Sequence, residues 1–169
     1  FNTLFEATKP GTNWSSRHFN INNREIYPPT LSISFQDSFN IQEVLDAHNI
    51  LREEVGVPPL EWSEDLAREA QSWAEKVALK NREEAWVLEH SGSGRGENIA
   101  GGYVSGDSPA QRVQLGWGEE EKVNFDPNTR KCIPGTVCGH YTQIVWRNTT
   151  KVGCGMAVNP NGKYILVCN

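Results

Sequence analysis

Apolar residues recur at helical spacing just after residue 39, and they predict the first helix of the chain. The inner face of this helix comprises Ile41, Val44, Leu45 and Val55. Asn40 precedes the run and Glu43 follows three residues later, as in the capping box at the start of many helices. Gly56 and the prolines beyond it end the pattern. His48 falls on the inner face, where the simplest role is that of a histidine satisfied within a helix interface.

The same periodicity predicts two further helices. Ser63 is the expected N-cap of the second helix. The apolar stripe of that helix consists of Leu66, Ala70, Trp73, Ala74 and Val77. Ser108 opens the third helix, with Pro109 in its first position and Gln111 completing a capping box. This third helix carries Trp117 and the glutamates that follow it.

Strand patterns appear near the C-terminus. Residues 152–158 and 163–168 predict two strands, and the segment 159–162 (NPNG) between them predicts a hairpin turn. We expect a short helix through His140 just before these strands. Residues 31–35, near the other end of the chain, alternate apolar and polar positions as in a short strand.

Composition narrows the class of protein. The 169 residues suit one domain with one core. Hydrophobic residues make up 37% of the chain, and no apolar run approaches the ~20 residues of a membrane span. Acidic side chains number 21 and basic ones 16, which gives a net charge of -5 with no basic cluster to offset it. Without a long apolar run we expect no membrane span. Because the net negative charge would repel phosphate backbones, we expect no nucleic-acid partner.

Four cysteines leave free thiols, metal ligands and disulfides as alternatives. None of them forms a Cys-x-x-Cys pair, which argues against a zinc ribbon and against a redox motif. Disulfides are therefore favoured. Because such bridges persist in oxidising compartments, we expect a secreted or extracellular protein, or one of the cell envelope if the source is bacterial.

Five short motifs stand out along the chain. They are residues 48–52 (HNILR), 90–91 (HS), 96–98 (GEN), Trp117 with the acids after it, and 139–149 (GHYTQIVWRNT) entered through Cys138. In this order they resemble the CAP superfamily, which is named after cysteine-rich secretory proteins, insect venom antigen 5 and plant pathogenesis-related protein 1. The resemblance covers residues 39–169 as one CAP (SCP) domain and leaves residues 1–38 as an N-terminal extension. It implies an α+β fold, a three-layer α-β-α sandwich around a small, mostly antiparallel sheet.

The resemblance also implies how the cysteines pair. The spacings from Cys132 to Cys138 and from Cys154 to Cys168 are similar to two of the three bridges of plant pathogenesis-related proteins. Both cysteines of the third bridge are missing from this chain. Loss of both partners together is what an oxidised protein tolerates, so the resemblance supports the oxidising compartment.

A metal site is a further implication of the resemblance. In the family, two histidines and two glutamates converge in a central cleft. By motif these correspond to His48, His140, Glu97 and one glutamate of the 119–121 run. The two imidazoles can hold a divalent metal, and the acids lie beside it or reach it through water. Neutral imidazole suits Zn²⁺, which is therefore the expected ion.

The second glutamate of this set is ambiguous. In the family, the acid usually follows the tryptophan by three residues and precedes an aromatic residue by four. Counting from Trp117 gives Glu120, whereas counting back from Phe125 gives Glu121. One inserted residue explains the conflict. We expect Glu120 to be the site residue, with Glu121 as the alternative and Glu119 as a solvated charge.

Three functions compete. The resemblance implies a secreted, noncatalytic binding module that takes a sterol or other lipid in an apolar groove and acts in host–microbe interaction or defence. The first alternative is a metal-dependent, protease-like hydrolase that uses His48 and His140, with Glu97 or Glu120 as general base. The second alternative is a ligand for a protein receptor or target, which it contacts through residues 1–38.

Smaller features adjust this picture. The residues around Ser91 do not form the Gly-x-Ser-x-Gly elbow of a nucleophilic serine, so no catalytic residue is assigned and the enzyme hypothesis stays the weaker one. Asn98 is expected to be structural, through hydrogen bonds that fix neighbouring motifs. Asn13 and Asn148 begin Asn-x-Ser/Thr acceptor patterns for glycosylation, which matter only in a eukaryotic source.

Overall fold

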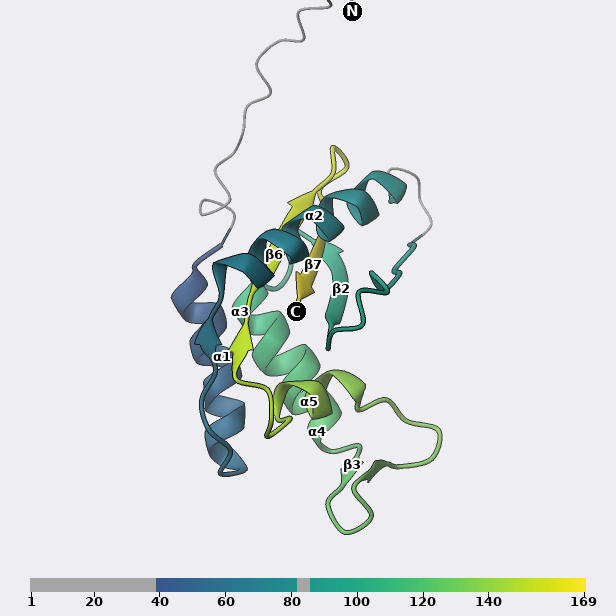
Figure 1. Ribbon diagram of the computed structural model, residues 1–169. Helices are drawn as coiled ribbons and strands as arrows, with labels where there is room; N and C mark the ends of the chain where they lie inside the picture. The colour runs from purple at the N-terminus through teal and green to yellow at the C-terminus, as the bar shows by residue number, and fades with distance from the viewer. Residues whose placement is uncertain (1–38, 82–85) are drawn as a thin grey trace, which may run out of the picture. The chain divides into compact units, whose positions relative to one another are not determined.

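A computed structural model describes residues 39–81 and 86–169. Asn13 and the strand expected at 31–35 lie outside these ranges. The elements are shown in Figure 1, and in chain order they are α1 (Ile41–Glu54), β1 (Glu61–Trp62), α2 (Glu64–Lys80), β2 (Asn98–Tyr103), α3 (Pro109–Gln111), the π-helix η3 (Arg112–Glu119), α4 (Glu120–Lys122), β3 (Phe125–Asp126), β4 (Lys131–Cys132), α5 (Gly139–Ile144), β5 (Lys151–Val152), β6 (Cys154–Val158) and β7 (Lys163–Cys168).

The predicted helix starts are confirmed. The Asn40 side chain accepts hydrogen bonds from two N–H groups in the first turn of α1. Ser63 accepts one such bond at the start of α2. Ser108 and Gln111 form a complete capping box at α3. Local sequence signals thus set where these helices begin, because the first N–H groups of a helix need acceptors from nearby side chains.

The third predicted helix is a single helix with an irregular middle. α3, η3 and α4 follow one another without a break from Pro109 to Lys122. The middle part is π-helical, and the N–H of Glu120 reaches the carbonyl oxygen of Leu115, five residues back. Because a π-turn holds more residues than an α-turn, it absorbs an extra residue. The structure therefore has a π-turn where the sequence indicates an insertion.

The main sheet consists of three antiparallel strands in the order β2-β7-β6. Because β7 is central, Cys168 lies opposite Asn98 on one side and opposite Cys154 on the other. β6 and β7 form the predicted hairpin. Two further strand pairs are short, with β1 parallel to β5 and β3 antiparallel to β4.

The strand expected at 152–158 is divided at Gly153. Val152 belongs to β5 and pairs with Trp62 of β1, whereas β6 begins at Cys154. A Cβ atom on Gly153 would lie 2.2 Å from the backbone nitrogen of Ala67. The glycine thus lets the chain pass close to the start of α2, and this tertiary contact is not visible in the local pattern.

The strand β2 was missed by the sequence analysis. It contains the adjacent residues Gly101 and Gly102, which weaken a strand pattern. A Cβ atom on Gly101 would lie 2.5 Å from the Trp86 ring, and one on Gly102 would lie 2.6 Å from the Tyr164 ring. Both glycines make room for aromatic rings from other segments, so their role appears only in the folded chain.

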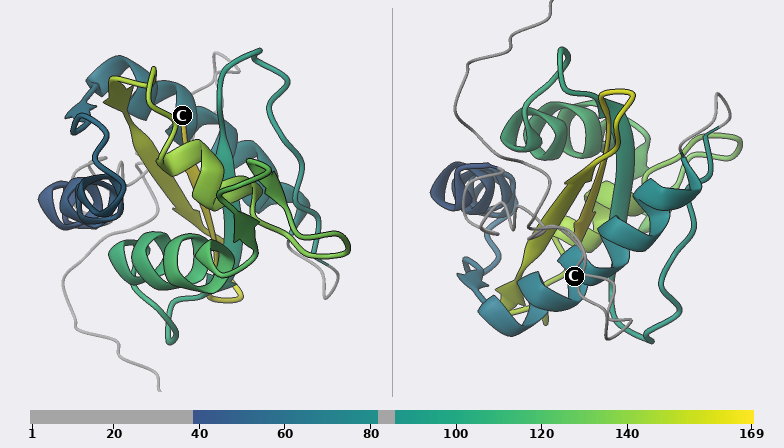
Figure 2. Two further views of the ribbon diagram at one scale, coloured as in Figure 1. Left: turned by 90° about the horizontal axis from the view of Figure 1, so that it is seen from below. Right: turned by 90° about the horizontal axis from the view of Figure 1, so that it is seen from above.

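The side chains of β7 alternate between two cores. Ile165 and Val167 pack with the alanines and Val77 of α2. Tyr164, Leu166 and Cys168 pack on the opposite face, with α1 and with the continuous helix formed by α3, η3 and α4, here called the long helix. Figure 2 shows the sheet lying between α2 on one side and α1 with the long helix on the other. The expected α-β-α sandwich is therefore confirmed.

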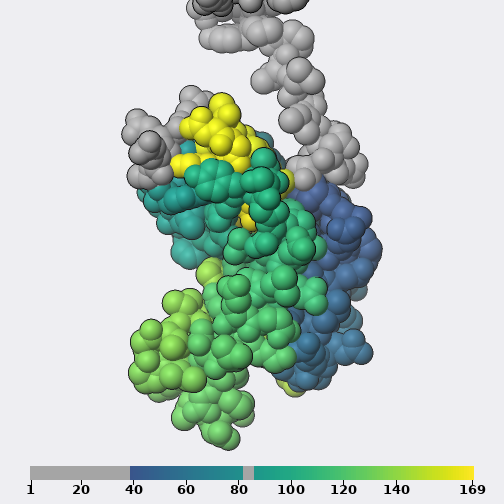
Figure 3. All heavy atoms as spheres, turned by 180° about the vertical axis from the view of Figure 1, so that it is seen from behind, coloured from purple at the N-terminus to yellow at the C-terminus, as the bar shows by residue number. Residues whose placement is uncertain are grey.

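Both predicted disulfides are present. Cys154–Cys168 joins facing residues of β6 and β7, and Cys132–Cys138 closes a loop just before α5. No cysteine is free. The segment between α4 and α5, which includes the second bridge, protrudes from the body of the domain (Figure 3). None of the helices in the described residues is long and apolar enough to cross a membrane.

Arg52 is a fully buried cation whose guanidinium is satisfied by backbone oxygens. Its guanidinium donates hydrogen bonds to the carbonyl oxygens of Pro58, Ile144, Trp146 and Thr149, at 2.7 to 2.9 Å. These bonds satisfy a charge that would otherwise be costly to bury. The turn that follows α5 is thereby fixed against the loop after α1.

Candidate functional site

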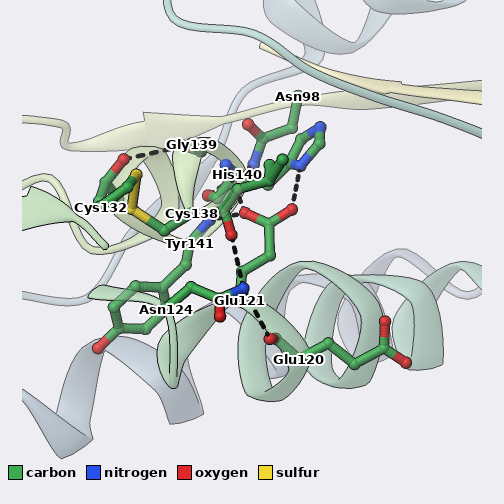
Figure 4. A network of polar contacts seen from close by, with 11 residues as sticks. Asn98, Glu120, Glu121, Asn124, Cys132, Cys138, Gly139, His140 and Tyr141 are labelled. Atoms are coloured by element: carbon green, nitrogen blue, oxygen red, sulfur yellow. Dashed lines mark hydrogen bonds and ion pairs between the residues drawn. A yellow bond between two sulfur atoms is a disulfide. The ribbon is translucent and has the colours of Figure 1, made fainter. Parts of the chain in front are cut away.

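His140 and Glu121 form one pair of the site, between α5 and α4 (Figure 4). The Nδ1 atom of His140 lies 2.5 Å from Glu121 Oε1. Glu121 Oε2 accepts hydrogen bonds from the N–H groups of His140 and Tyr141, at 2.9 and 3.2 Å. The indole of Trp117 stacks on the imidazole, with centroids 5.5 Å apart and planes 11° from parallel. One carboxylate and one indole thus fix the position of the ring.

His90 and Glu97 form a second pair of the same kind. His90 Nδ1 lies 2.6 Å from Glu97 Oε1, and the N–H of Ser91 donates to both oxygens of this carboxylate. The Glu97 side chain is only 4% exposed, whereas that of His90 is 64% exposed. Because a buried carboxylate needs donors, His90 and Ser91 satisfy Glu97 while the outer edge of the imidazole faces solvent.

The two pairs are joined by the segment 96–98. The Asn98 side chain, next to Glu97, donates a hydrogen bond of 3.1 Å to the carbonyl oxygen of His140. A Cβ atom on Gly96 would lie 2.5 Å from the Gln143 amide, so the glycine lets this segment pack directly on α5. Asn98 has the structural role expected from the sequence.

His48, which the resemblance assigned to the metal site together with His140, lies in the core of the domain. It is 2% exposed, and its Nδ1 lies 2.8 Å from the carbonyl oxygen of Val44. Burial lowers the pKa of His48 from 6.5 to about 4, so the ring is neutral at neutral pH. Its hydrogen bond goes to α1 itself, while the two glutamates of the site hold His90 and His140.

The sequence analysis did not single out His90, which the structure pairs with Glu97. The motif at 90–91 was recognised, but the site histidine was assigned to His48 instead. The signal that could have found it is the seven-residue separation from Glu97, across a glycine-rich loop that can turn back on itself.

The structure brings Glu121, and not Glu120, to His140. Glu120 is exposed, and Figure 4 shows its side chain directed away from the imidazole. The physical reason is the π-turn, which takes up the inserted residue and leaves Trp117 and Glu121 facing the same ring. Glu119 lies 3.9 Å from Lys122 at the surface, as expected of a solvated charge.

The donor set of these pairs suits a metal. An ionised carboxylate only accepts hydrogen bonds, so Nδ1 of each paired imidazole carries a proton; in the neutral form of such a ring Nε2 has a lone pair. A histidine that ligates a metal through one nitrogen typically donates the other N–H to a carboxylate or a carbonyl. His90 and His140 both have this arrangement. With a metal on the imidazoles, Glu97 and Glu121 would orient the rings rather than ligate the ion.

The hydrolase candidates have less suitable surroundings. Both oxygens of Glu97 already accept hydrogen bonds from Ser91 or His90. Glu120 is exposed and lies away from His140. The Ser91 hydroxyl oxygen accepts a hydrogen bond from the N–H of Ser93 within an exposed loop.

The chain belongs to the cysteine-rich secretory protein family, or CAP family, whose model matches residues 45–169. It is 43% identical to pathogenesis-related protein 1A of Nicotiana tabacum over 128 residues, which cover 76% of this chain and 72% of that protein. It is 40% identical to pathogenesis-related protein 1 of Arabidopsis thaliana over 130 residues, with coverage of 76% and 73%. The resemblance inferred from the motifs is therefore confirmed.

Solved structures support the same fold. Venom allergen-like protein 4 of Schistosoma mansoni superposes with a TM-score of 0.55 at 24% identity, covering 75% of this chain and 84% of that one. The protein NaASP2, whose crystal structure was solved with Zn²⁺, superposes with a TM-score of 0.55 at 21% identity, covering 78% and 80%. At these identities the likeness concerns the fold alone.

Proposed function

We propose that this CAP protein is a secreted, noncatalytic binding protein that holds a divalent metal, Zn²⁺, at His90 and His140 and captures a sterol or other lipid on an adjacent apolar surface. The observation that carries the proposal is the pair of imidazoles whose Nδ1 atoms are each held by a carboxylate. When bound, the metal would supply positive charge in the cleft, while Glu97 and Glu121 fix the two rings.

The metal proposal makes a prediction about single residues. His90→Ala and His140→Ala should each remove most of the Zn²⁺ affinity measured by calorimetry. Glu121→Gln should weaken binding by about 10- to 100-fold, as is typical when the residue that orients a ligand is changed. Glu120→Gln is the matched control and should bind like the wild type, because this carboxylate is exposed and directed away. Binding should weaken on acidification, since protons compete for the imidazole nitrogens.

Two outcomes would contradict this assignment. Loss of affinity in Glu120→Gln with none in Glu121→Gln would reverse the choice of glutamate. Loss in His48→Gln with none in His90→Ala would restore the ligand set expected from the sequence, His48 with His140.

The lipid surface is proposed from exposed apolar side chains of the segment between Glu121 and His140. Val123 is 73% exposed, Val137 62% and Ile133 44%. They surround Asn124, whose carbonyl oxygen accepts the Ile133 N–H and whose side chain donates to the Val137 carbonyl oxygen. Exposed apolar patches of this kind mark interaction surfaces. The patch lies between Glu121 and His140 in sequence, and the Asn124 N–H donates a hydrogen bond of 3.0 Å to the Glu121 carbonyl oxygen.

The double variant Val123→Glu with Val137→Glu should reduce sterol binding by about tenfold or more, because full burial of one such side chain is worth about 1.5–3 kcal/mol. Binding is measured with a fluorescent sterol and with sterol-containing vesicles. Leu115→Glu is the control, since Leu115 is 46% exposed on η3, away from this patch. Glu97→Ala should retain lipid binding, because hydrophobic burial does not need that carboxylate. Equal losses in Leu115→Glu would refute the assigned surface.

The compartment and the biological role are part of the proposal. Two disulfides suit an oxidising, extracellular environment. Several relatives are named pathogenesis-related proteins, which supports a role in host–microbe interaction or defence. Asn148 is exposed in a turn and is accessible to glycosylation in a eukaryotic source. Peptide or ester hydrolysis that vanishes on chelation and in Glu97→Ala would favour the hydrolase instead.

A further inference from the structure

His48, Cys154 and Cys168 bring potential metal ligands together in the core of the domain. One ligand atom from each of the three lies within 4.8 Å of the others. All three residues are buried. In the oxidised protein the two sulfur atoms are bonded to each other, so neither is a thiolate. The cluster is therefore not a metal site while the bridge is intact.

The positions of these three residues do not depend on the bridge alone. Cys154 and Cys168 are facing residues of an antiparallel pair, and β7 is also hydrogen-bonded to β2 on its other side. His48 lies on α1, and its Nδ1 is held by the Val44 carbonyl oxygen. This leaves Nε2 of the neutral ring with its lone pair. Breaking the S–S bond would leave two thiols and an oriented imidazole close together.

A small cavity beside the cluster offers room for a fourth ligand. Its volume is about 20 Å³, and His48, Cys168 and Asn169 are among its lining residues. This volume suffices for one water molecule. The Oδ1 atom of Asn169 is buried and has no hydrogen-bond partner among the described residues. An amide oxygen or a water molecule can therefore complete a shell of four.

We propose that reduction of the Cys154–Cys168 disulfide converts this cluster into a buried Zn²⁺ site formed by two thiolates, the His48 imidazole and one oxygen ligand. Zn–S bonds of about 2.3 Å and Zn–N bonds of about 2.0–2.1 Å place neighbouring ligand atoms roughly 3.5 Å apart. Ligand atoms within 4.8 Å of one another reach this geometry with small side-chain movements. Thiolate ligands select thiophilic ions over Mg²⁺ and Ca²⁺.

A dithiol reductant supplies the electrons and protons needed to open the Cys154–Cys168 disulfide. A dithiol transfers two electrons and two protons to the disulfide, which breaks into two thiols while the dithiol becomes a disulfide. Binding of Zn²⁺ then releases the two thiol protons to solvent. Every newly made chain passes through the reduced form before its bridges close. Metal bound at this stage would keep Cys154 and Cys168 from pairing with the other two cysteines.

The test uses Co²⁺ in place of Zn²⁺, because thiolate ligation to cobalt gives sulfur-to-metal charge-transfer absorption. The full chain with Cys132→Ser and Cys138→Ser keeps only the Cys154–Cys168 bridge. This bridge is reduced with a phosphine, because a dithiol reductant would itself bind the metal. We expect the charge-transfer band at one Co²⁺ per chain after reduction and none before it. His48→Gln in the same chain should weaken Co²⁺ binding at least tenfold. The chain with Cys154→Ser and Cys168→Ser should lack a band of this stoichiometry and affinity.

A second measurement does not depend on the His48 variant. In the reduced wild type, Zn²⁺ should protect Cys154 and Cys168 from alkylation and leave Cys132 and Cys138 reactive, as mapped by mass spectrometry. The absence of the band in the reduced chain would overturn the proposal, as would a band unchanged by His48→Gln or equal alkylation of all four cysteines. A reduced chain that is unfolded and stays unfolded with Co²⁺ would also overturn it, whereas recovery of the fold with Co²⁺ would support it. Metal binding at His90 and His140 gives no thiolate band, so the two sites are distinguished.

Discussion

Burial decides the protonation of His48. The ring lies in the core beside Arg52, and its Nδ1–H is used by the Val44 carbonyl oxygen. Removal from water disfavours the charged imidazolium, which is why its pKa is lowered from 6.5 to about 4. His140, by contrast, is 28% exposed and is held by Glu121. The two histidines thus differ in burial and in hydrogen-bond partner, a backbone carbonyl oxygen for His48 and a carboxylate for His140.

His48 should make the fold sensitive to acid. Its folded-state pKa of about 4 lies below the unfolded value of 6.5, so the unfolded chain takes up the proton first as pH falls. The His48 contribution to the free energy of unfolding should therefore decrease between pH 6.5 and about 4, by up to about 3 kcal/mol, and this contribution should change no further below that window. Denaturant titrations at several pH values measure this slope. His48→Gln should flatten the slope in this window; a slope equal to that of the wild type would refute the prediction.

At the scale of elements, the long helix shows how an insertion can be absorbed without loss of a contact. A regular α-helix turns by about 100° per residue, so one added residue would rotate the following side chain away from its partner. The π-helix η3 has more residues per turn, and Glu121 keeps its bond to His140 although it follows Trp117 by four residues.

Deletion of Glu119 should therefore be tolerated. It restores the three-residue step between Trp117 and the following acid, which suits a regular α-helix. We expect Zn²⁺ affinity within about threefold of wild type, because one π-turn is exchanged for an α-turn that presents the same carboxylate. Calorimetry with Glu121→Gln as the reference for a broken pair decides this. A loss as large as in Glu121→Gln would show that the deletion does not preserve the pairing.

Elements also show what the sequence could predict. The starts of α1, α2 and α3 depend on side chains within one turn, and all three were predicted from Asn40, Ser63 and Ser108. β2 and the division at Gly153 depend on rings and backbone from remote segments, so no local pattern indicated them. The bond between Glu121 and His140 has the same cause, because the two residues come from separate segments whose approach is not encoded in spacing.

At the scale of the whole molecule, both disulfides lie inside the CAP domain expected at residues 39–169. The match to the family model likewise begins at residue 45. The family resemblance supplied the sandwich, since periodicity alone does not say which faces meet.

A chain that begins at residue 39 should consequently fold and bind Zn²⁺ like the full chain. We expect an unfolding midpoint within about 3 °C of the full chain, because a loss below about 1 kcal/mol shifts the midpoint of a domain of this size by only a few degrees. Thermal denaturation and calorimetry test this. Aggregation or a much lower midpoint would make residues 1–38 part of the domain. A protein partner that binds only the full chain would support the hypothesis that these residues are a contact surface.

The four hydrogen bonds of the buried Arg52 have a consequence for which residues of such a protein can vary in evolution. The four acceptors are all main-chain carbonyl oxygens, so these four bonds do not depend on the side chains of the turn after α5. Trp146 and Arg147 are exposed there, and Arg147 adds a hydrogen bond of 3.5 Å to the Gly56 carbonyl oxygen. Mutations of the exposed side chains of this turn leave the four Arg52 hydrogen bonds intact. Selection can therefore change the surface of the turn while these bonds keep its backbone geometry.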